Sequence, residues 1–185
     1  MSSASRLSAL ALVVVACAMS ACGTTHALHR GAMPAAIHDV MTGVLVGDGY
    51  GCKPAPDRTW VDCVHPTEPD VSFAYLAPSN TLTVFTTFSR LDTDIDARWR
   101  SETCVDVADE VKAINDETIV KLSCHPKTLQ FEMLTWVPDG GLGDDDIHGF
   151  VGVFVASVAE VITTRGMIAR PAEAAPAAAE PAADL

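Results

Sequence analysis

The spacing of apolar positions divides residues 34 to 168 into helical and extended segments. A first helix is predicted directly after Pro34, because apolar residues recur every three or four positions, and Gly47 and Gly49 end it. The same spacing predicts a second helix from Ala97 to Ile114 and a third, the most regular, from Asp145 to Thr164. The apolar positions of the first helix are Ile37, Val40, Met41, Val44 and Leu45.

Five segments rich in β-branched and aromatic residues predict strands between these helices. They cover residues 58–65, 71–77, 81–89, 118–126 and 128–138. The element order α-β-β-β-α-β-β-α indicates antiparallel hairpins. We therefore expect an α+β domain, with one five-stranded antiparallel sheet and helices packed on one face.

The two ends of the chain differ in composition from this domain. Residues 1–22 resemble a bacterial export signal, since an apolar run that is short for a membrane span is followed by small residues. Residues 23–33 show no periodicity and predict a tether. Residues 169–185 are almost entirely Ala, Pro and acidic residues, which predicts a disordered tail.

The stretch Met19-Ser20-Ala21-Cys22-Gly23 resembles a lipobox, the motif in which a cysteine becomes lipidated. This resemblance implies Cys22 as the lipidation site and a protein held on a bacterial membrane with its domain outside the cytoplasm. Cys17 follows a similar pattern, and a plain signal peptide or an uncleaved short anchor is the other alternative.

Four cysteines remain once the signal segment is set aside, and an even number in an exported domain predicts two disulfides. Cys104 and Cys124 both fall on predicted apolar faces, while Cys52 and Cys63 flank the approach to the first strand. We predict the pairs Cys52–Cys63 and Cys104–Cys124; free thiols or another pairing are the alternatives.

The chain is acidic, with 12 basic and 24 acidic side chains. Such a balance repels nucleic acid and anionic membrane surfaces, so nucleic-acid binding is not expected.

The segment from Val107 to Ile162, with a D-G-G turn and three aspartates before the last helix, resembles the YbjN-domain family, described as sensory transduction regulators with a fold similar to type III secretion chaperones. The resemblance covers about 130 residues of element order. It implies a domain without established catalytic residues. Chaperones of that fold dimerise and hold extended client segments, which implies a homodimer and a protein or peptide partner.

Two groups of aspartates raise the alternative of a calcium-dependent sensor or an enzyme. Asp92, Asp94 and Asp96 begin like a calcium loop, but Ala97 and Thr103 stand where its glycine and glutamate belong. Residues 144–146 precede the last helix. Asp144 is expected to be its N-cap, with Asp145 and Asp146 in the first turn.

No phosphate-binding loop, dinucleotide motif or nucleophile motif is present in the sequence. None of the six histidines has metal-ligand spacing to another histidine or a cysteine. They are His26, His29, His38, His65, His125 and His148, and His148 is expected to be exposed. We therefore expect neither an enzyme nor a metal or other cofactor.

Leu134 and Trp136 share the strand face opposite Phe131 and Met133. An uncovered sheet face that carries them would bind a partner, although a loop or the tail could cover it. Trp99 is expected to anchor the second helix. The sequence thus favours a lipid-anchored envelope protein whose domain binds a protein or peptide through Leu134 and Trp136.

Overall fold

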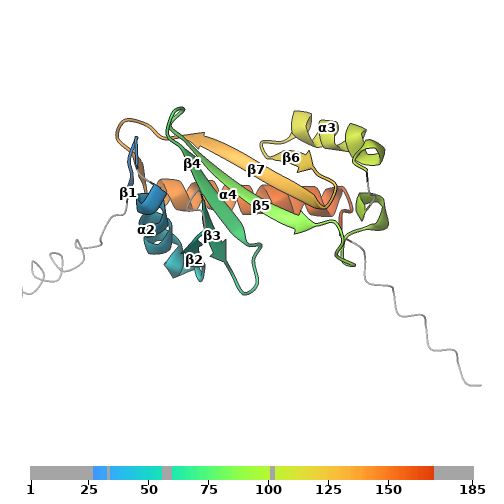
Figure 1. Ribbon diagram of the computed structural model, residues 1–185, viewed down its shortest axis with the longest axis horizontal. Helices are drawn as coiled ribbons and strands as arrows, with labels where there is room; N and C mark the ends of the chain where they lie inside the picture. The colour runs from blue at the N-terminus through green and yellow to red at the C-terminus, as the bar shows by residue number, and fades with distance from the viewer. Residues whose placement is uncertain (1–26, 33, 56–59, 101–102, 169–185) are drawn as a thin grey trace, which may run out of the picture.

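The computed structural model describes residues 27–32, 34–55, 60–100 and 103–168 (Figure 1). The predicted signal segment, the lipidation site and the tail lie outside the described residues. Helices and strands follow in the order β1 (Ala27–Leu28), α2 (Pro34–Leu45), η1 (Val46–Asp48), β2 (Gly51–Pro54), β3 (Val61–Val64), β4 (Val71–Leu76), β5 (Thr81–Ser89), η2 (Ala97–Arg100), η3 (Val105–Val107), α3 (Ala108–Glu117), β6 (Lys121–Cys124), β7 (Thr128–Trp136), β8 (Leu142–Gly143) and α4 (Asp144–Thr164).

The main sheet is antiparallel and contains six strands in the order β2-β3-β4-β5-β7-β6. The α+β prediction is confirmed at this level, but the prediction of five strands was wrong by one. The additional strand is β2, which pairs with β3 along the edge. Lys53 and Pro54 hid it in the sequence, because proline cannot donate to a ladder and is tolerated only at such edges.

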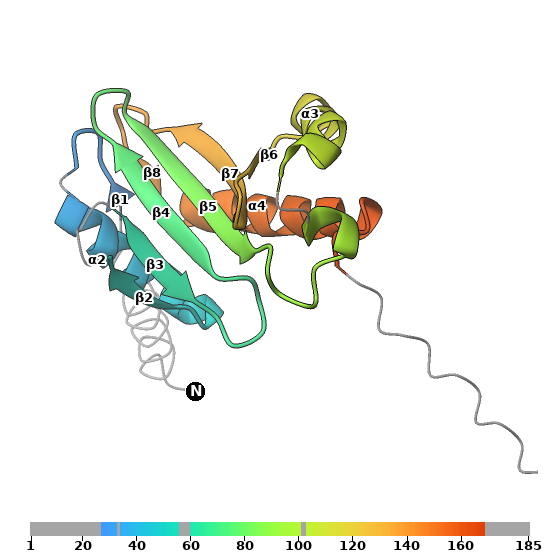
Figure 2. The same ribbon diagram turned by 45° about the vertical axis from the view of Figure 1, so that its right-hand side comes forward.

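Two of the helices cover one face of this sheet. α2 packs against β2, β3 and β4, and α4 crosses behind β5 and β7 (Figures 1 and 2). Between them and the sheet lies one apolar core. Helix α4 contributes Ile147, Val151, Phe154, Val158 and Val161, all buried.

Helix α3 does not join them on that face, contrary to the prediction. It lies beyond the edge strand β6 (Figure 2). The side chain of Asn115 fixes it there, since Nδ2 donates to the carbonyl oxygen of Leu122 at 3.0 Å and Oδ1 accepts from the Leu122 N–H at 2.6 Å.

Helix α4 is long enough and apolar enough to cross a membrane, and among the described helices it is the one that meets both conditions. Its apolar stripe is nevertheless packed into the core, and three aspartates occupy its first turn. The arrangement is that of a core helix in a folded domain.

The predicted helix from Ala97 to Ile114 is interrupted, so this prediction was wrong in its extent: η2, η3 and α3 replace it. The buried guanidinium of Arg90 donates through Nε to the carbonyl oxygen of Trp99 at 2.8 Å and through Nη2 to that of Thr103 at 3.2 Å. In a continuous helix these carbonyls would accept from N–H groups four residues later. Arg90 binds these carbonyls instead. Trp99 is fully buried, as an anchor would be, but it belongs to η2 and not to the helix α3.

Part of the predicted tether belongs to the domain. Ala27 and Leu28 pair with Gly143 and Leu142 as β1, and Leu28 is buried. The Gly31 N–H donates to the hydroxyl of Tyr75 at 2.7 Å. A strand of two residues is too short to show a periodic pattern, so the sequence could not reveal it.

Both predicted disulfides are present. Cys52 and Cys63 lie directly opposite each other on β2 and β3, and their bond closes that edge of the sheet. Cys104 and Cys124 join the start of η3 to the end of β6, with 5.8 Å between their Cα atoms. Two disulfides in one small domain indicate an oxidising compartment outside the cytoplasm.

Candidate functional site

Leu134 and Trp136 project from β7 on the side of the sheet away from α2 and α4. Their surfaces are 56% and 54% exposed, whereas Phe131 and Met133 on the other side are buried. The face assigned to each from the alternation of residues is therefore confirmed.

The strand register adds neighbours to this pair. Trp136 lies in one row with Thr81 of β5 and Leu76 of β4, and Leu134 lies in the next row, with Thr83 and Ala74. These six residues define what we call the open face: Ala74, Leu76, Thr81, Thr83, Leu134 and Trp136. In Figure 1, α4 passes behind the sheet and no described helix or strand crosses the side of β4, β5 and β7 turned to the viewer. Thr83, in the middle of this face, is buried by its neighbours.

Further along the strands, the same side of the sheet also carries polar residues. Ser72 on β4 donates from its hydroxyl to Asp62 Oδ1 on β3 at 2.6 Å, and Gln130 and Glu132 lie on β7, on the other side of β5. Polar residues thus border the open face, while Phe85 on β5 and the 53% exposed Val64 on β3 add apolar surface further along the same side. An apolar patch with a polar rim is the arrangement found at sites of protein binding.

Arg30 borders the open face and was missed by sequence reasoning, because it lies in the predicted tether. Its guanidinium carbon stands 5.6 Å from the centroid of the Trp136 ring, and the guanidinium also pairs with Asp139. Pairing of β1 with β8 brings it there. Only the folded chain places this cation beside Trp136.

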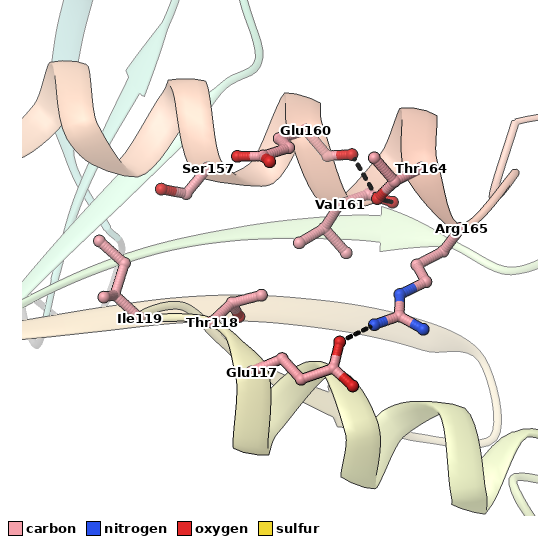
Figure 3. Close-up of a pocket in the computed structure, with 8 residues that line it drawn as sticks. All are labelled: Glu117, Thr118, Ile119, Ser157, Glu160, Val161, Thr164 and Arg165. Atoms are coloured by element: carbon pink, nitrogen blue, oxygen red, sulfur yellow. Dashed lines mark hydrogen bonds and ion pairs between the residues drawn. The ribbon is translucent and has the colours of Figure 1, made fainter.

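Two hollows follow one another along a single side of α4. The first, of about 380 Å³, lies between the end of β7 and the first half of α4. The second, of about 540 Å³, lies between the end of α3 and the second half of α4. In Figure 3 Ile119 points from the loop toward α4, and Glu117 pairs with Arg165 at the far end. The α4 residues that line the two are Asp146, Gly149, Phe150, Val153, Ser157, Glu160, Val161, Thr164 and, just beyond the helix, Arg165.

The aspartates at 92, 94 and 96 form a turn. The Ile95 N–H donates to the Asp92 carbonyl at 3.2 Å, and Asp96 Oδ1 accepts from the Arg98 N–H at 3.0 Å, at the start of η2. Asp92 and Asp94 are exposed. Within the described ranges, no group of three or more His, Cys, Asp or Glu residues is arranged to hold a metal ion.

The three aspartates 144–146 lie in the first turn of α4, but the predicted N-cap was wrong. Gly143, not Asp144, is the N-cap, and Asp146 in the third helical position reaches back to it. Its Oδ2 accepts from the Gly143 N–H at 3.0 Å. The reach of a carboxylate from the third position satisfies a donor outside the helix, which Asp144 could not do from the first.

His148 is only partly exposed and is paired, where the sequence predicted plain exposure. Its Nδ1 lies 2.7 Å from Asp48 Oδ2, which joins α4 to η1. His65 accepts from the Glu68 N–H at 2.7 Å, and its ring centroid lies 4.8 Å from that of Tyr50. Burial, followed by the charges of Glu68, Asp48 and Asp70, raises the pKa of the Tyr50 hydroxyl. These contacts tie loops to the domain.

Comparison of the chain with protein-family models, with curated proteins and with solved structures gave no match. The function must therefore be inferred from the residues and their arrangement.

Proposed function

We propose that this chain is a lipid-anchored protein of the bacterial cell envelope whose YbjN-like, non-catalytic domain binds a protein or peptide partner. The observation that carries the proposal is the open face, where Leu134 and Trp136 both keep more than half of their surface exposed. Exposed tryptophan beside a cation is typical of the residues that dominate protein interfaces.

The described residues support binding over catalysis. All four cysteines of the domain are held in disulfides, which removes them as nucleophiles. Of the aspartates that raised the alternative of a metal-dependent sensor or enzyme, Asp96 and Asp146 accept backbone hydrogen bonds at the starts of η2 and α4. Calorimetric titration with calcium should show no binding. Tight binding that is lost in Asp94→Asn would favour the calcium-sensor alternative.

The disulfides support the location, because they need an oxidising compartment. Only residues 23–26 separate Cys22 from β1. Lipidation of Cys22 would therefore hold β1 within about 17 Å of the lipid, from the reach of an extended chain. Mass spectrometry of the N-terminal peptide should show acyl chains on Cys22, and Cys22→Ser should release the protein from membranes. Release by Cys17→Ser instead would move the anchor to Cys17.

The binding proposal is tested by a photo-crosslinking amino acid placed at single positions of the full chain in intact cells. An adduct is expected from position 134 on the open face. Val105 is the matched control, since it is also apolar and is 79% exposed on η3. Adducts of equal yield from both positions, or none from position 134, would contradict binding at the open face.

A further inference from the structure

One stretch of the sheet has an unpaired edge. β5 pairs with β7 along its whole length, from Thr128 to Trp136, whereas β6 pairs only with Leu129–Glu132. The last four residues of β7, Met133–Trp136, therefore have no neighbouring strand on the β6 side within the described part of the chain.

The backbone groups of Leu134 and Trp136 point out of this edge. The Val137 N–H donates to Asn80 on the β5 side, and the Thr128 N–H donates to His125 on the β6 side. Because backbone N–H and C=O groups alternate in direction along a strand, even-numbered residues of β7 face the β6 side. The two residues with exposed side chains thus also present free donors and acceptors.

The other two edges of the sheet are protected against an added strand. On β2, Lys53 and Pro54 are the residue types that block strand pairing at an edge. On β6, Asn115 binds both the N–H and the C=O of Leu122. At the Met133–Trp136 edge, the described residues include neither a lysine or proline in the strand nor a side chain that binds the outward backbone groups.

A groove accompanies the unpaired edge. The hollow of about 380 Å³ is lined by Met133 and Leu134 on β7 and by Phe150 and Val153 on α4. It is followed along α4 by the hollow beside Ile119 (Figure 3). The α4 residues that line the two hollows run from Asp146 to Thr164. At the rise of an α-helix this stretch is about 27 Å long, which is the length of about eight residues of an extended peptide.

The charges of the groove select its occupant. Asp146, Glu117 and Glu160 line it against the single cation Arg165, which is paired with Glu117. An approaching segment with basic residues is favoured over an acidic one. Apolar side chains at alternate positions would meet Val153 and Ile119, which are 49% and 58% exposed.

We infer that this edge and groove bind an extended, basic peptide segment, which adds to β7 as a strand through the backbone of Leu134 and Trp136. The inference rests on the proposed function and specifies the partner: a segment with alternating apolar residues and lysine or arginine between them.

The test uses the full chain and a fluorescent eight-residue peptide of alternating valine and lysine. Binding measured by anisotropy should saturate. A second peptide, of the same sequence but N-methylated at alternate residues so that it cannot donate to the strand edge, should bind at least about tenfold more weakly. A peptide of alternating valine and glutamate should also bind more weakly.

Variants locate the binding on the chain. Leu134→Pro removes an N–H that points out of the edge and so costs no ladder bond, and it should weaken binding at least about tenfold. Val153→Arg, which fills the groove with a cation and leaves the strand intact, should do the same. Val105→Arg places the same charge on η3 and should bind as the unaltered chain does.

The inference is wrong if the valine-lysine peptide does not bind, or if N-methylation and both groove variants leave its affinity unchanged. Crosslinking from position 134 in cells would then still support the open face, so the two proposals fail separately. A third outcome is that the peptide does not bind and the chain sediments as a dimer that Leu134→Pro dissociates. The edge would then pair with a second copy of the chain, and the inference of a basic peptide partner would be wrong.

Discussion

The guanidinium of Arg30 lies over the ring of Trp136, 5.6 Å from its centroid, at the border of the open face. Both side chains remain about half exposed, so the contact holds the indole in place without burying it. A cation and an exposed indole at such a distance stabilise each other by about 0.5–1 kcal/mol. The pair is thus positioned for a partner and contributes little to the fold.

Replacement of Trp136 and of Trp99 should affect the stability of the domain very differently. Trp136→Ala should lower the free energy of unfolding by no more than about 1 kcal/mol. Trp99→Ala should lower it by about 3–5 kcal/mol, because Trp99 is fully buried. Urea denaturation measures both. A large decrease in the free energy of unfolding of Trp136→Ala would mean that the open face contributes to the stability of the core and is not free for a partner.

Arg90 should be among the most sensitive positions of the domain. Besides Trp99 and Thr103 it binds the carbonyl oxygen of His125 at 2.8 Å and lies close to Cys104. Arg90→Ala should cost at least about 3 kcal/mol, because buried carbonyls lose a charged donor. The exposed Arg98 serves as the control, and Arg98→Ala should cost less than about 1 kcal/mol. Equal effects in thermal denaturation would contradict the role assigned to Arg90.

The start of α4 distinguishes Asp146 from its neighbour. Asp146→Ala should destabilise the domain by about 1 kcal/mol, because the Gly143 N–H loses its acceptor. Asp145→Ala, in the same turn and exposed, removes only the charge near the helix end and should cost about half of that or less. Should Asp145→Ala prove the more costly, the capping role of Asp146 would be wrong.

Alkaline pH should destabilise the domain through Tyr50, whose pKa burial and nearby carboxylates raise above the ordinary 10.0. A raised pKa in the folded state contributes stability that is fully present below the ordinary pKa and is lost as the pH rises through the folded value. As the pH rises above about 10, the unaltered chain should therefore lose more stability than Tyr50→Phe. Circular dichroism measures the stability of both proteins against pH. An equal loss of stability in the unaltered chain and in Tyr50→Phe would exclude Tyr50 as the cause.

The sequence predicted what depends on local periodicity. The exposed side of β7, the buried stripe of α4 and the pair Cys104–Cys124 followed from the spacing of apolar positions, and the pair Cys52–Cys63 followed from its place beside the first predicted strand. The break after Trp99 did not, because Arg90 reaches it from the end of β5. The groove also could not be predicted, since it arises where β6 begins opposite Glu132 and α4 passes the unpaired remainder of β7.

The most direct test of the binding proposal is the affinity of the partner crosslinked from position 134, once purified, for the unaltered chain and for the Leu134→Ala, Trp136→Ala double variant. Isothermal titration should show binding weakened at least about tenfold, which corresponds to about 1.4 kcal/mol, with the fold intact by circular dichroism. Unchanged affinity in the double variant would contradict the claim that the open face binds the partner.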